Sequence, residues 1–233
     1  MDQEKIGGDI HVWHAPLDCD GDFRAQLEAT LSPDELERAK RFHFAKDGNR
    51  YVVARGLLRK LLGGYLHRAP ADLEFSYGEY GKPDLSGLNA SSGYSFNLSH
   101  SAGVVVFAIG KERNLGIDVE LIKPDSAGED IARRFFSPSE VSDLQTLPPE
   151  SRAEAFFHCW TRKEAYLKAR GKGLQIPLDT FSVSLRPGGP AQFLSGVDSQ
   201  WQIAGFSPAE GYVAAVVYDG PPCAIKYFPI DSQ

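Results

Sequence analysis

An internal repeat is the sequence feature that most constrains how this chain can fold. Residues 31–36 (LSPDEL) resemble residues 136–141 (FSPSEV), residues 54–56 (ARG) recur at 169–171, and residues 103–108 (GVVVFA) loosely match residues 211–216 (GYVAAV). The order of the three pieces is kept although their spacing drifts. A chain that repeats a whole unit is expected to form two related halves. We expect these halves to span residues 1–113 and 114–233.

Each half is expected to contain the same kinds of element. Ser32 and Ser137 have the character of helix N-caps, because each is followed by proline and then by an acidic residue. A long helix is predicted over 48–66 and another over 152–169, each ended by glycine. Strands are predicted at 73–77, 94–98, 104–110, 115–120, 181–185, 202–206, 212–218 and 224–229. Helices with antiparallel strands in each half predict an α+β fold.

The composition excludes several classes of protein. The chain has 233 residues, 42% of them apolar, which suffices for one large domain or two small ones. Its net charge of −6 argues against a nucleic-acid surface, which needs a basic face. The first residues lack an apolar signal core, and the longest apolar run, 104–109, is too short to cross a bilayer. Three scattered cysteines fit a reducing compartment, so we expect a cytoplasmic protein without membrane contacts.

Two basic islands interrupt this acidic chain. Residues 38–60 hold eight Lys or Arg and one acid, and residues 162–172 hold five Lys or Arg and one acid. Such islands are typical either of a local site for a polyanion or of solvated helix faces.

A pair of carboxylates is the first candidate for chemistry. Residues 115–120 (LGIDVE) alternate so that Asp118 and Glu120 share one face of a predicted strand. Neighbouring acids on one face repel each other, and a divalent cation would offset that repulsion. Carboxylate oxygens of this kind suit Mg²⁺. The alternative is an exposed edge strand with solvated acids.

A helical stripe is the second candidate. Trp160, Glu164 and Lys168 are spaced so that they share one face of the predicted helix. Glu164 and Lys168 also suit an ordinary surface pair. The glycine-spaced basic segment that follows, residues 170–173 (RGKG), would allow lysine and backbone amides to hold phosphate oxygens.

A serine and a histidine are the third candidate. Ser99 and His100 lie in residues 96–103 (FNLSHSAG), between two apolar segments. A hydrolase is not indicated, because a GxSxG motif is missing and adjacent residues of an extended chain point to opposite faces. His100 is placed at a strand-to-strand turn, where it would donate to phosphate together with Ser99 or be an inert turn residue. Lys82, in the turn at 80–83 (YGKP), is uninformative alone.

Together these motifs resemble the Sfp-type 4′-phosphopantetheinyl transferase family. The matching stretches, in the family's order, are 81–83 (GKP), 96–101 (FNLSHS), 116–120 (GIDVE), 135–137 (FFS) with Glu140, 160–168 (WTRKEAYLK) and 171–174 (GKGL). The resemblance implies a monomer with a pseudo-twofold duplication of two similar α+β halves and an active site in the cleft between them. It also implies coenzyme A as donor, Mg²⁺ or Mn²⁺ as cofactor, and an acidic acyl or peptidyl carrier protein as acceptor.

Residue roles carry over from this resemblance. Asp118, Glu120 and Glu164 would be the metal ligands, and Lys168 would contact the phosphate at the cleaved bond. The nucleotide end would be held by a further set, namely Arg50, Ser99, His100 and, at the adenine, Lys82. Lys40 and Arg41 would add positive charge around the phosphates. Glu35 and Leu121 are departures, since lysine occurs at both positions in members of the family.

The reaction implied is attack by a carrier serine on the β-phosphorus of coenzyme A, with 3′,5′-ADP as leaving group. Glu164, directly or through a water, is the candidate general base. The carrier would dock near residues 131–136, where Arg133 and Arg134 lie. Alternatives are a Mg²⁺-dependent coenzyme A pyrophosphatase and a catalytically dead carrier-binding module. The presence of the three acids and of Lys168 counts against the second of these.

Overall fold

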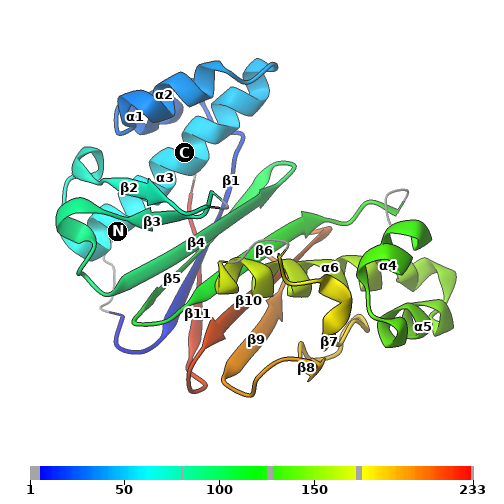
Figure 1. Cartoon of the computed structure of the whole chain (residues 1–233). Helices are drawn as coiled ribbons and strands as arrows, with labels where there is room; N and C mark the ends of the chain where they lie inside the picture. Colours follow the sequence, from blue (N-terminus) through cyan, green and yellow to red (C-terminus); the bar gives the residue numbers. More distant parts are fainter. Residues whose placement is uncertain (1–5, 80, 125–127, 172–174, 232–233) are drawn as a thin grey trace.

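The chain is described by a computed structural model that covers residues 6–79, 81–124, 128–171 and 175–231 (Figure 1). The elements up to residue 111 are β1 (Ile10–Pro16), α1 (Gly21–Glu28), α2 (Pro33–Lys40), α3 (Ala45–Leu66), η1 (Pro70–Asp72), β2 (Phe75–Tyr77), β3 (Pro83–Leu85), η2 (Gly87–Asn89), β4 (Tyr94–Ser101) and β5 (Val104–Lys111). Those that follow are β6 (Leu115–Leu121), α4 (Glu129–Phe135), α5 (Pro138–Thr146), α6 (Pro149–Arg170), η5 (Leu178–Thr180), β7 (Ser182–Val183), β8 (Phe193–Ser195), β9 (Trp201–Phe206), β10 (Tyr212–Asp219) and β11 (Ile225–Pro229).

The two halves repeat one arrangement of strands and a long helix, which confirms the predicted α+β class. One sheet has the strand order β11-β1-β5-β4 and the other has the order β6-β10-β9. The hairpins β4–β5 and β9–β10 are antiparallel, and β1 and β6 each pair antiparallel with the second strand of a hairpin. The long helices α3 and α6 lie against different sheets (Figure 1).

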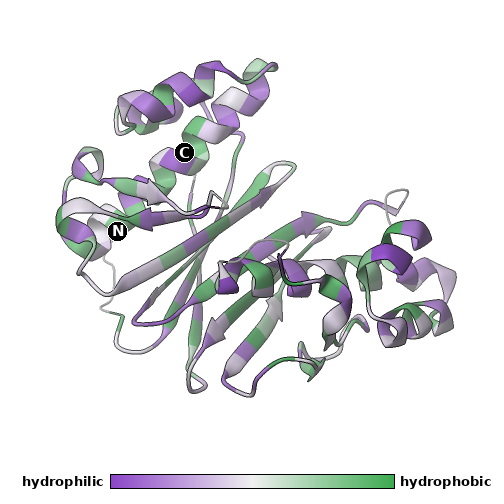
Figure 2. Cartoon of the chain, in the orientation of Figure 1, coloured by the Kyte–Doolittle hydropathy of each residue, from purple (hydrophilic) through white to green (hydrophobic). Residues whose placement is uncertain are grey.

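The hydrophobic core has three parts. One cluster lies between α3 and the first sheet, and a second lies between α6 and the second sheet. A third cluster joins the two sheets, with Val12 and Val106 from the first packed with Ile117, Val119 and Val216 from the second. The two halves therefore share apolar surface, while the peripheral helices α1 and α2 are coloured mainly hydrophilic in Figure 2. Among the described residues, no helix is both long and apolar enough to span a bilayer.

The last strand crosses back to the first half. β11 pairs in parallel with β1, in the register Ile10↔Ile225 to His14↔Pro229. Sequence analysis did not predict β1 at all. Its residues are nearly all buried, so the strand lacks the alternation of apolar and polar residues that reveals a half-buried strand.

A buried ion-pair cluster ties α2 to α3 in the first half. Ser32 caps α2 and forms a capping box with Glu35, whose side chain is 1% exposed. Glu35 accepts hydrogen bonds from Arg55 Nε and Nη2 at 2.9 and 2.6 Å, and from Arg59 Nε at 2.7 Å. Arg59 Nη1 also donates to two backbone carbonyls around η1, at 2.9 Å each. Glu35 is one of the two positions at which this sequence departs from the family pattern, and its side chain is buried within the first half.

The second half has a similar buried ion pair, with a lysine in place of the two arginines. Ser137 caps α5 and forms a capping box with Glu140, which lies 2.8 Å from the buried ammonium of Lys163 on α6. Lys163 Nζ donates to the carbonyls of Leu178 and Phe181, at 2.7 and 2.6 Å. In each half, therefore, a capping-box glutamate holds a buried cation of the long helix, and that cation binds carbonyls around the following 3₁₀ turn. The sequence repeat marks this shared arrangement.

A glycine lets β6 lie directly against α6. A Cβ placed on Gly116 would overlap the backbone of Ala165, Lys168 and Ala169, and helix backbone cannot move aside as a flexible side chain can. We expect Gly116→Ala to cost about 3 kcal/mol in the free energy of unfolding, at the upper end of overpacking effects. Urea denaturation measures it, with Gly21→Ala as control because a Cβ at Gly21 would meet nothing within 4 Å. Equal stability of the two variants would contradict the close contact.

Candidate functional site

The candidate site lies where edge strands of the two sheets run side by side. β4 ends one sheet and β6 ends the other, and alternate polar side chains of β4 reach across to β6. The bonds are Ser95 Oγ to the Arg113 carbonyl, Ile117 N to Asn97 Oδ1, Ser99 Oγ to Asp118 and Ser101 Oγ to Glu120. Side chains of the first half therefore fix the strand of the second half that carries the two acids.

Asp118 is the centre of the site. Its side chain is buried, and Oδ1 accepts hydrogen bonds from Ser99 Oγ at 2.8 Å and from Lys168 Nζ at 2.6 Å. Lys168 Nζ also donates to Ser99 Oγ at 2.9 Å, which closes a triangle of β4, β6 and α6. Asp118 Oδ2 is buried and has no hydrogen-bond partner among the described residues.

Two further carboxylates face Asp118. Glu164 lies on α6, one helical turn before Lys168, and Glu120 lies two residues beyond Asp118 on β6. Burial raises the pKa of Glu164, and repulsion from Asp118 adds to the effect. Burial also raises the pKa of Glu120, with a contribution from Asp118, while the hydrogen bond from Ser101 opposes it. The three acids therefore act on one another, and the repulsion between Asp118 and Glu120 is the one that the alternation along β6 predicted.

The donor chemistry fits a hard divalent cation. Among the described residues, no set of three or more Asp, Glu, His and Cys side chains is already gathered so that it could hold a metal ion. The site nonetheless offers carboxylate oxygens alone, which Mg²⁺ and Mn²⁺ accept. Asp118 Oδ2 is a buried oxygen without a hydrogen-bond partner among the described residues, so its lone pairs are available to a cation. Asp118, Glu120 and Glu164 are the residues that would hold the ion.

Arg50 and His100 lie on another side of the site. Arg50, on α3, donates from Nε and Nη2 to the two oxygens of Asp18, at 2.9 and 2.7 Å. Asp18 was not predicted, since a lone acid after an apolar segment gives no signal. Partial burial lowers the pKa of His100, and the charges of Lys168 and Arg50 lower it further. Arg50, Lys168 and His100 therefore lie within electrostatic reach of one another.

His100 differs from its expected place in the chain. The structure puts it inside β4, and the turn to β5 is made by Ala102, with φ of 48°, and Gly103. The apolar residues that follow begin only at Val104, so the sequence signal for the strand ended earlier than the strand itself. The expectation of a turn histidine was wrong, while Ser99 and His100 do point to opposite sides, with Ser99 buried and His100 exposed.

Lys82 holds the backbone of both β6 and α6. Its Nζ donates to the carbonyl of Leu115 at 3.0 Å and to the carbonyl of Lys168 at 2.8 Å. Burial lowers the pKa of this ammonium. A turn of the first half is thereby tied to the start of β6 and to the last turn of α6. The adenine contact expected for Lys82 stays a prediction.

The outlying residues of the expected nucleotide site lie at the surface. Lys40 is exposed and pairs with Glu37 on α2 at 2.9 Å, and Arg41 caps the C-terminus of that helix. Their expected contribution to a phosphate field stays a prediction. Gly171 ends α6 in the left-handed conformation, with φ of 63°, as expected of a C-terminal glycine. The remainder of the GKGL motif, residues 172–174, and residue 80 lie outside the described residues.

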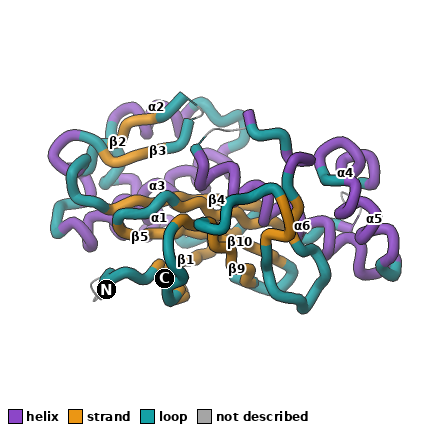
Figure 3. The backbone as a smooth tube through the Cα atoms, turned by 60° about the horizontal axis from the view of Figure 1, so that its bottom comes forward, coloured by secondary structure: helices purple, strands orange, loops and turns teal. Residues whose placement is uncertain are grey.

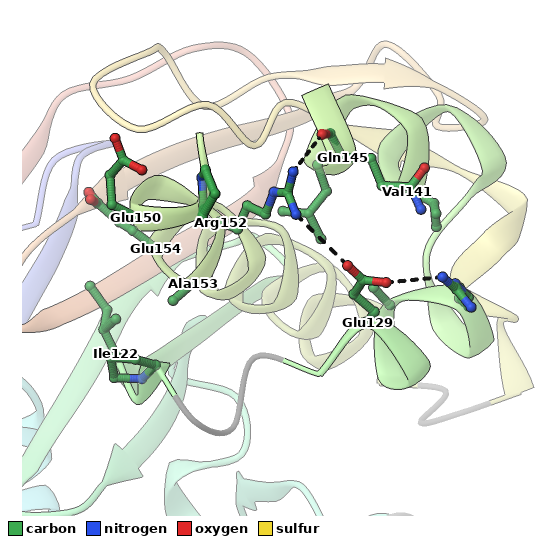
Figure 4. Close-up of a pocket in the computed structure, with 13 residues that line it drawn as sticks. Ile122, Glu129, Val141, Gln145, Glu150, Arg152, Ala153 and Glu154 are labelled. Carbon is green, nitrogen blue, oxygen red and sulfur yellow. Dashed lines mark hydrogen bonds and ion pairs between the residues drawn. The ribbon is translucent and has the colours of Figure 1, made fainter. Parts of the chain in front are cut away.

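Two hollows flank α4. One, of about 240 Å³, is lined by Glu120 and by apolar residues that include Ile131, Phe157 and Trp160. The other, of about 600 Å³, lies between α4, α5 and the start of α6. Figure 4 shows Glu129 in that hollow, bonded to Arg133 at 3.0 Å and 3.9 Å from Arg152. The smaller hollow is lined both by Ile131 of α4 and by the carboxylate residue Glu120 of β6.

Both halves of the chain match models of known protein families. A family model described as 4′-phosphopantetheinyl transferase, N-terminal, matches residues 18–112, and one described as the 4′-phosphopantetheinyl transferase superfamily matches residues 114–217. The chain is 41% identical to the 4′-phosphopantetheinyl transferase HetI of Nostoc sp. over 92% of this chain and 90% of that protein. It is 36% identical to the 4′-phosphopantetheinyl transferase Sfp of Bacillus subtilis over 80% of this chain and 81% of that protein. The solved holo-[acyl-carrier-protein] synthase of Thermotoga maritima aligns with 47% of this chain and 64% of its own, at 22% identity and a TM-score of 0.37.

Proposed function

Because this chain belongs to the Sfp-type 4′-phosphopantetheinyl transferases, which transfer 4′-phosphopantetheine from coenzyme A to carrier proteins, we propose that Asp118, Glu120, Glu164 and Lys168 perform that transfer. The observation that supports this most is the triangle of Asp118, Ser99 and Lys168, in which a carboxylate oxygen without a partner among the described residues lies beside a half-buried ammonium. In Figure 3 the label of α6 lies to one side of that of β4, and the side chain of Lys168 on α6 reaches Ser99 on β4, with 2.9 Å between Nζ and Oγ.

The chemistry is phosphoryl transfer between a diphosphate and a hydroxyl. The carrier serine oxygen bonds to the β-phosphorus of coenzyme A, and the bond from that phosphorus to the bridging oxygen breaks. The electron pair leaves with 3′,5′-ADP, and the serine proton passes to a base. Such reactions depend on positioning and charge neutralisation more than on covalent help from the protein. The protein's own contribution is therefore to position the reacting groups and to neutralise their charge.

The residues divide this task between them. Mg²⁺ or Mn²⁺, held by Asp118, Glu120 and Glu164, would supply positive charge to the diphosphate oxygens. Lys168 stabilises the charge that develops on the leaving phosphate, since its ammonium lies at the same carboxylate. Glu164, one helical turn from Lys168, is the group placed to accept the serine proton. Arg50 and His100 bind the phosphates of the nucleotide end.

The metal requirement is tested by intact mass spectrometry. An apo carrier protein incubated with the chain, coenzyme A and Mg²⁺ is expected to gain one phosphopantetheine arm. EDTA is expected to prevent that gain, and added Mn²⁺ in place of Mg²⁺ to restore it. Full transfer in EDTA would contradict the metal assignment. Release of 3′,5′-ADP without carrier would indicate the pyrophosphatase instead.

The carrier is proposed to dock at α4. Ile131 is 40% exposed there and lines the hollow that reaches Glu120, so a carrier on α4 would place its serine near the carboxylates. Arg133 already pairs with Glu129, whereas the guanidinium of Arg134 lies 5.2 Å from the ring centre of Phe135. Because both halves and their shared core come from one chain, we also propose that the enzyme acts as a monomer.

Charge reversal tests this docking. Arg134→Glu is expected to raise the Michaelis constant for an acidic carrier and to leave that for coenzyme A unchanged, because it alters the surface charge that guides the carrier. Arg133→Glu is expected to have a smaller effect, since Glu129 already offsets that charge. Arg68→Glu, an exposed site just beyond α3, is the control. An unchanged constant in Arg134→Glu would move the docking site away from α4.

A further inference from the structure

The hydroxyl group of Ser101, on β4, binds a carboxylate of the neighbouring strand β6. Ser101 is buried, and its Oγ donates to Glu120 Oε2 at 2.6 Å. The same Oγ accepts a hydrogen bond from the backbone N–H of Leu121 at 3.2 Å. Ser101 was part of a motif in the sequence, but no role was expected for it.

The two bonds together fix the direction of the hydroxyl. A serine hydroxyl has one proton, and it accepts through its lone pairs. Since the amide of Leu121 donates to Oγ, the proton of Ser101 is left for Glu120. The backbone of β6 therefore orients the hydroxyl, and the hydroxyl orients a carboxylate of that same strand. A hydrogen bond to an ionised carboxylate is also stronger than one between neutral groups.

The spacing of the two strands makes this arrangement regular. Ser99 and Ser101 lie two residues apart on β4, and they donate to Asp118 and Glu120, which lie two residues apart on β6. Each hydroxyl can satisfy only one of the two oxygens of its carboxylate. Asp118 shows the consequence, because its Oδ1 is held by Ser99 and Lys168 while its buried Oδ2 has no partner among the described residues.

Glu120 needs such a restraint more than Asp118 does. Its side chain has one more rotatable bond, it is only half-buried near the end of β6, and Asp118 repels it. Lys168 restrains Asp118 directly, through a contact of 2.6 Å. Without a fixed donor, the carboxylate of Glu120 would gain by turning away from Asp118 toward solvent.

We propose that Ser101 is a positioning residue that holds the carboxylate of Glu120 in place as a cation ligand. This inference rests on the proposed function, because it assumes that Glu120 binds the metal. Groups that orient metal ligands in this way typically change metal affinity 10- to 100-fold when they are removed. Ser101 therefore sets the affinity of the site for its cation without touching coenzyme A.

The chain offers a matched control on the same strand. Ser95 Oγ donates to the carbonyl of Arg113 at 2.5 Å, so Ser95→Ala removes a hydroxyl bond from β4 to the segment just before β6 without altering a carboxylate. Ser101→Thr keeps the hydroxyl and is the conservative variant. Glu120→Gln is the reference for loss of the ligand itself.

Binding of Mn²⁺ to the purified chain, measured by electron paramagnetic resonance of the free ion, is the experiment. Ser101→Ala is expected to weaken Mn²⁺ binding about 10-fold or more, while Ser95→Ala and Ser101→Thr bind as the wild type does. The Mg²⁺ concentration for half-maximal transfer is expected to rise in parallel, with little change in the Michaelis constant for coenzyme A. Thermal unfolding of the Ser101 and Ser95 alanine variants at similar temperatures shows that the loss is local.

Two results would overturn the inference, and they are distinguishable. Wild-type Mn²⁺ affinity in Ser101→Ala, with binding lost in Glu120→Gln, removes Ser101 from the site and leaves the proposed function intact. Unchanged binding in Glu120→Gln removes the metal assignment itself. If Ser101→Ala is too unstable to measure, Ser101→Cys, which has nearly the same size and a weaker donor, takes its place, and wild-type affinity there has the same meaning.

Discussion

Lys168→Met is expected to slow phosphopantetheine transfer by about 10²- to 10³-fold, as loss of one electrostatic stabiliser typically does. The ammonium lies 2.6 Å from Asp118 Oδ1 and 2.9 Å from Ser99 Oγ, and methionine keeps the apolar stem but removes the charge. The backbone of Lys168 keeps its own anchor, because its carbonyl is held by Lys82. We therefore expect the fold to survive the substitution and the loss to fall on catalysis.

Single-turnover transfer to an apo carrier, followed by intact mass, measures this effect. Lys111→Met removes an exposed lysine from the end of β5 and serves as the control. Asp118→Asn, which keeps the shape of the side chain, is expected to be at least as slow as Lys168→Met, because the same pair of charges is broken. A Lys168→Met rate equal to that of the control would remove Lys168 from the chemistry.

The second large effect concerns stability. Glu35→Gln is expected to destabilise the chain by about 3–5 kcal/mol, the usual cost of leaving a buried charge without its partner. Two guanidinium groups depend on this carboxylate, and Arg55 and Arg59 are only 5% and 1% exposed. Glu37→Gln on the same helix is the matched control, because its partner Lys40 is exposed and such pairs contribute about 0–1 kcal/mol. Equal urea midpoints for the two variants would contradict the prediction.

Acid unfolding gives an independent measure of the same cluster. Burial alone raises the pKa of Glu35, but the hydrogen bond and charges of Arg59 and Arg55 outweigh it and lower the pKa below the ordinary 4.5. The unfolded chain then binds the proton more readily than the folded one. This contribution to stability is complete above the ordinary pKa and is lost as the pH falls through the pKa of the folded state. The wild-type protein is expected to lose the stability that the Glu35 carboxylate contributes as the pH falls into the acid range. Glu35→Gln is expected to lack this contribution at every pH.

The fold was predictable from the sequence where local patterns determine it. The two long helices were predicted at 48–66 and 152–169 and are observed at Ala45–Leu66 and Pro149–Arg170. Gly171 ends α6 as predicted, whereas Gly63 and Gly64 lie inside α3, which ends instead at His67 in the left-handed conformation. The helical periodicity and the N-cap motifs of the repeat at Ser32 and Ser137 are short-range signals. β1 was missed because both of its faces are buried, and its pairing with β11 joins residues at opposite ends of the sequence. Pairing over such a distance leaves no local pattern.

The candidate site was predictable only in part, for a related reason. Alternation along β6 indicated that Asp118 and Glu120 share a face, and helical spacing grouped Glu164 with Lys168. The partners of these groups are contributed by distant segments, as with Ser101 for Glu120 and Asp18 for Arg50. Serine and aspartate are common residues in turns and strands, so their type carries no signal until the fold brings them to a partner.

The parallel pairing of β1 with β11 has a consequence for the order in which the protein assembles during synthesis. β1 leaves the ribosome long before β11, so the outer edge of β1 has no native partner until β11 has been made. An open strand edge can pair with other chains, and contacts between distant segments form slowly because a long loop must first close. The nascent first half therefore carries an exposed strand edge while the second half is being made, and the first sheet is completed only when β11 has been synthesised.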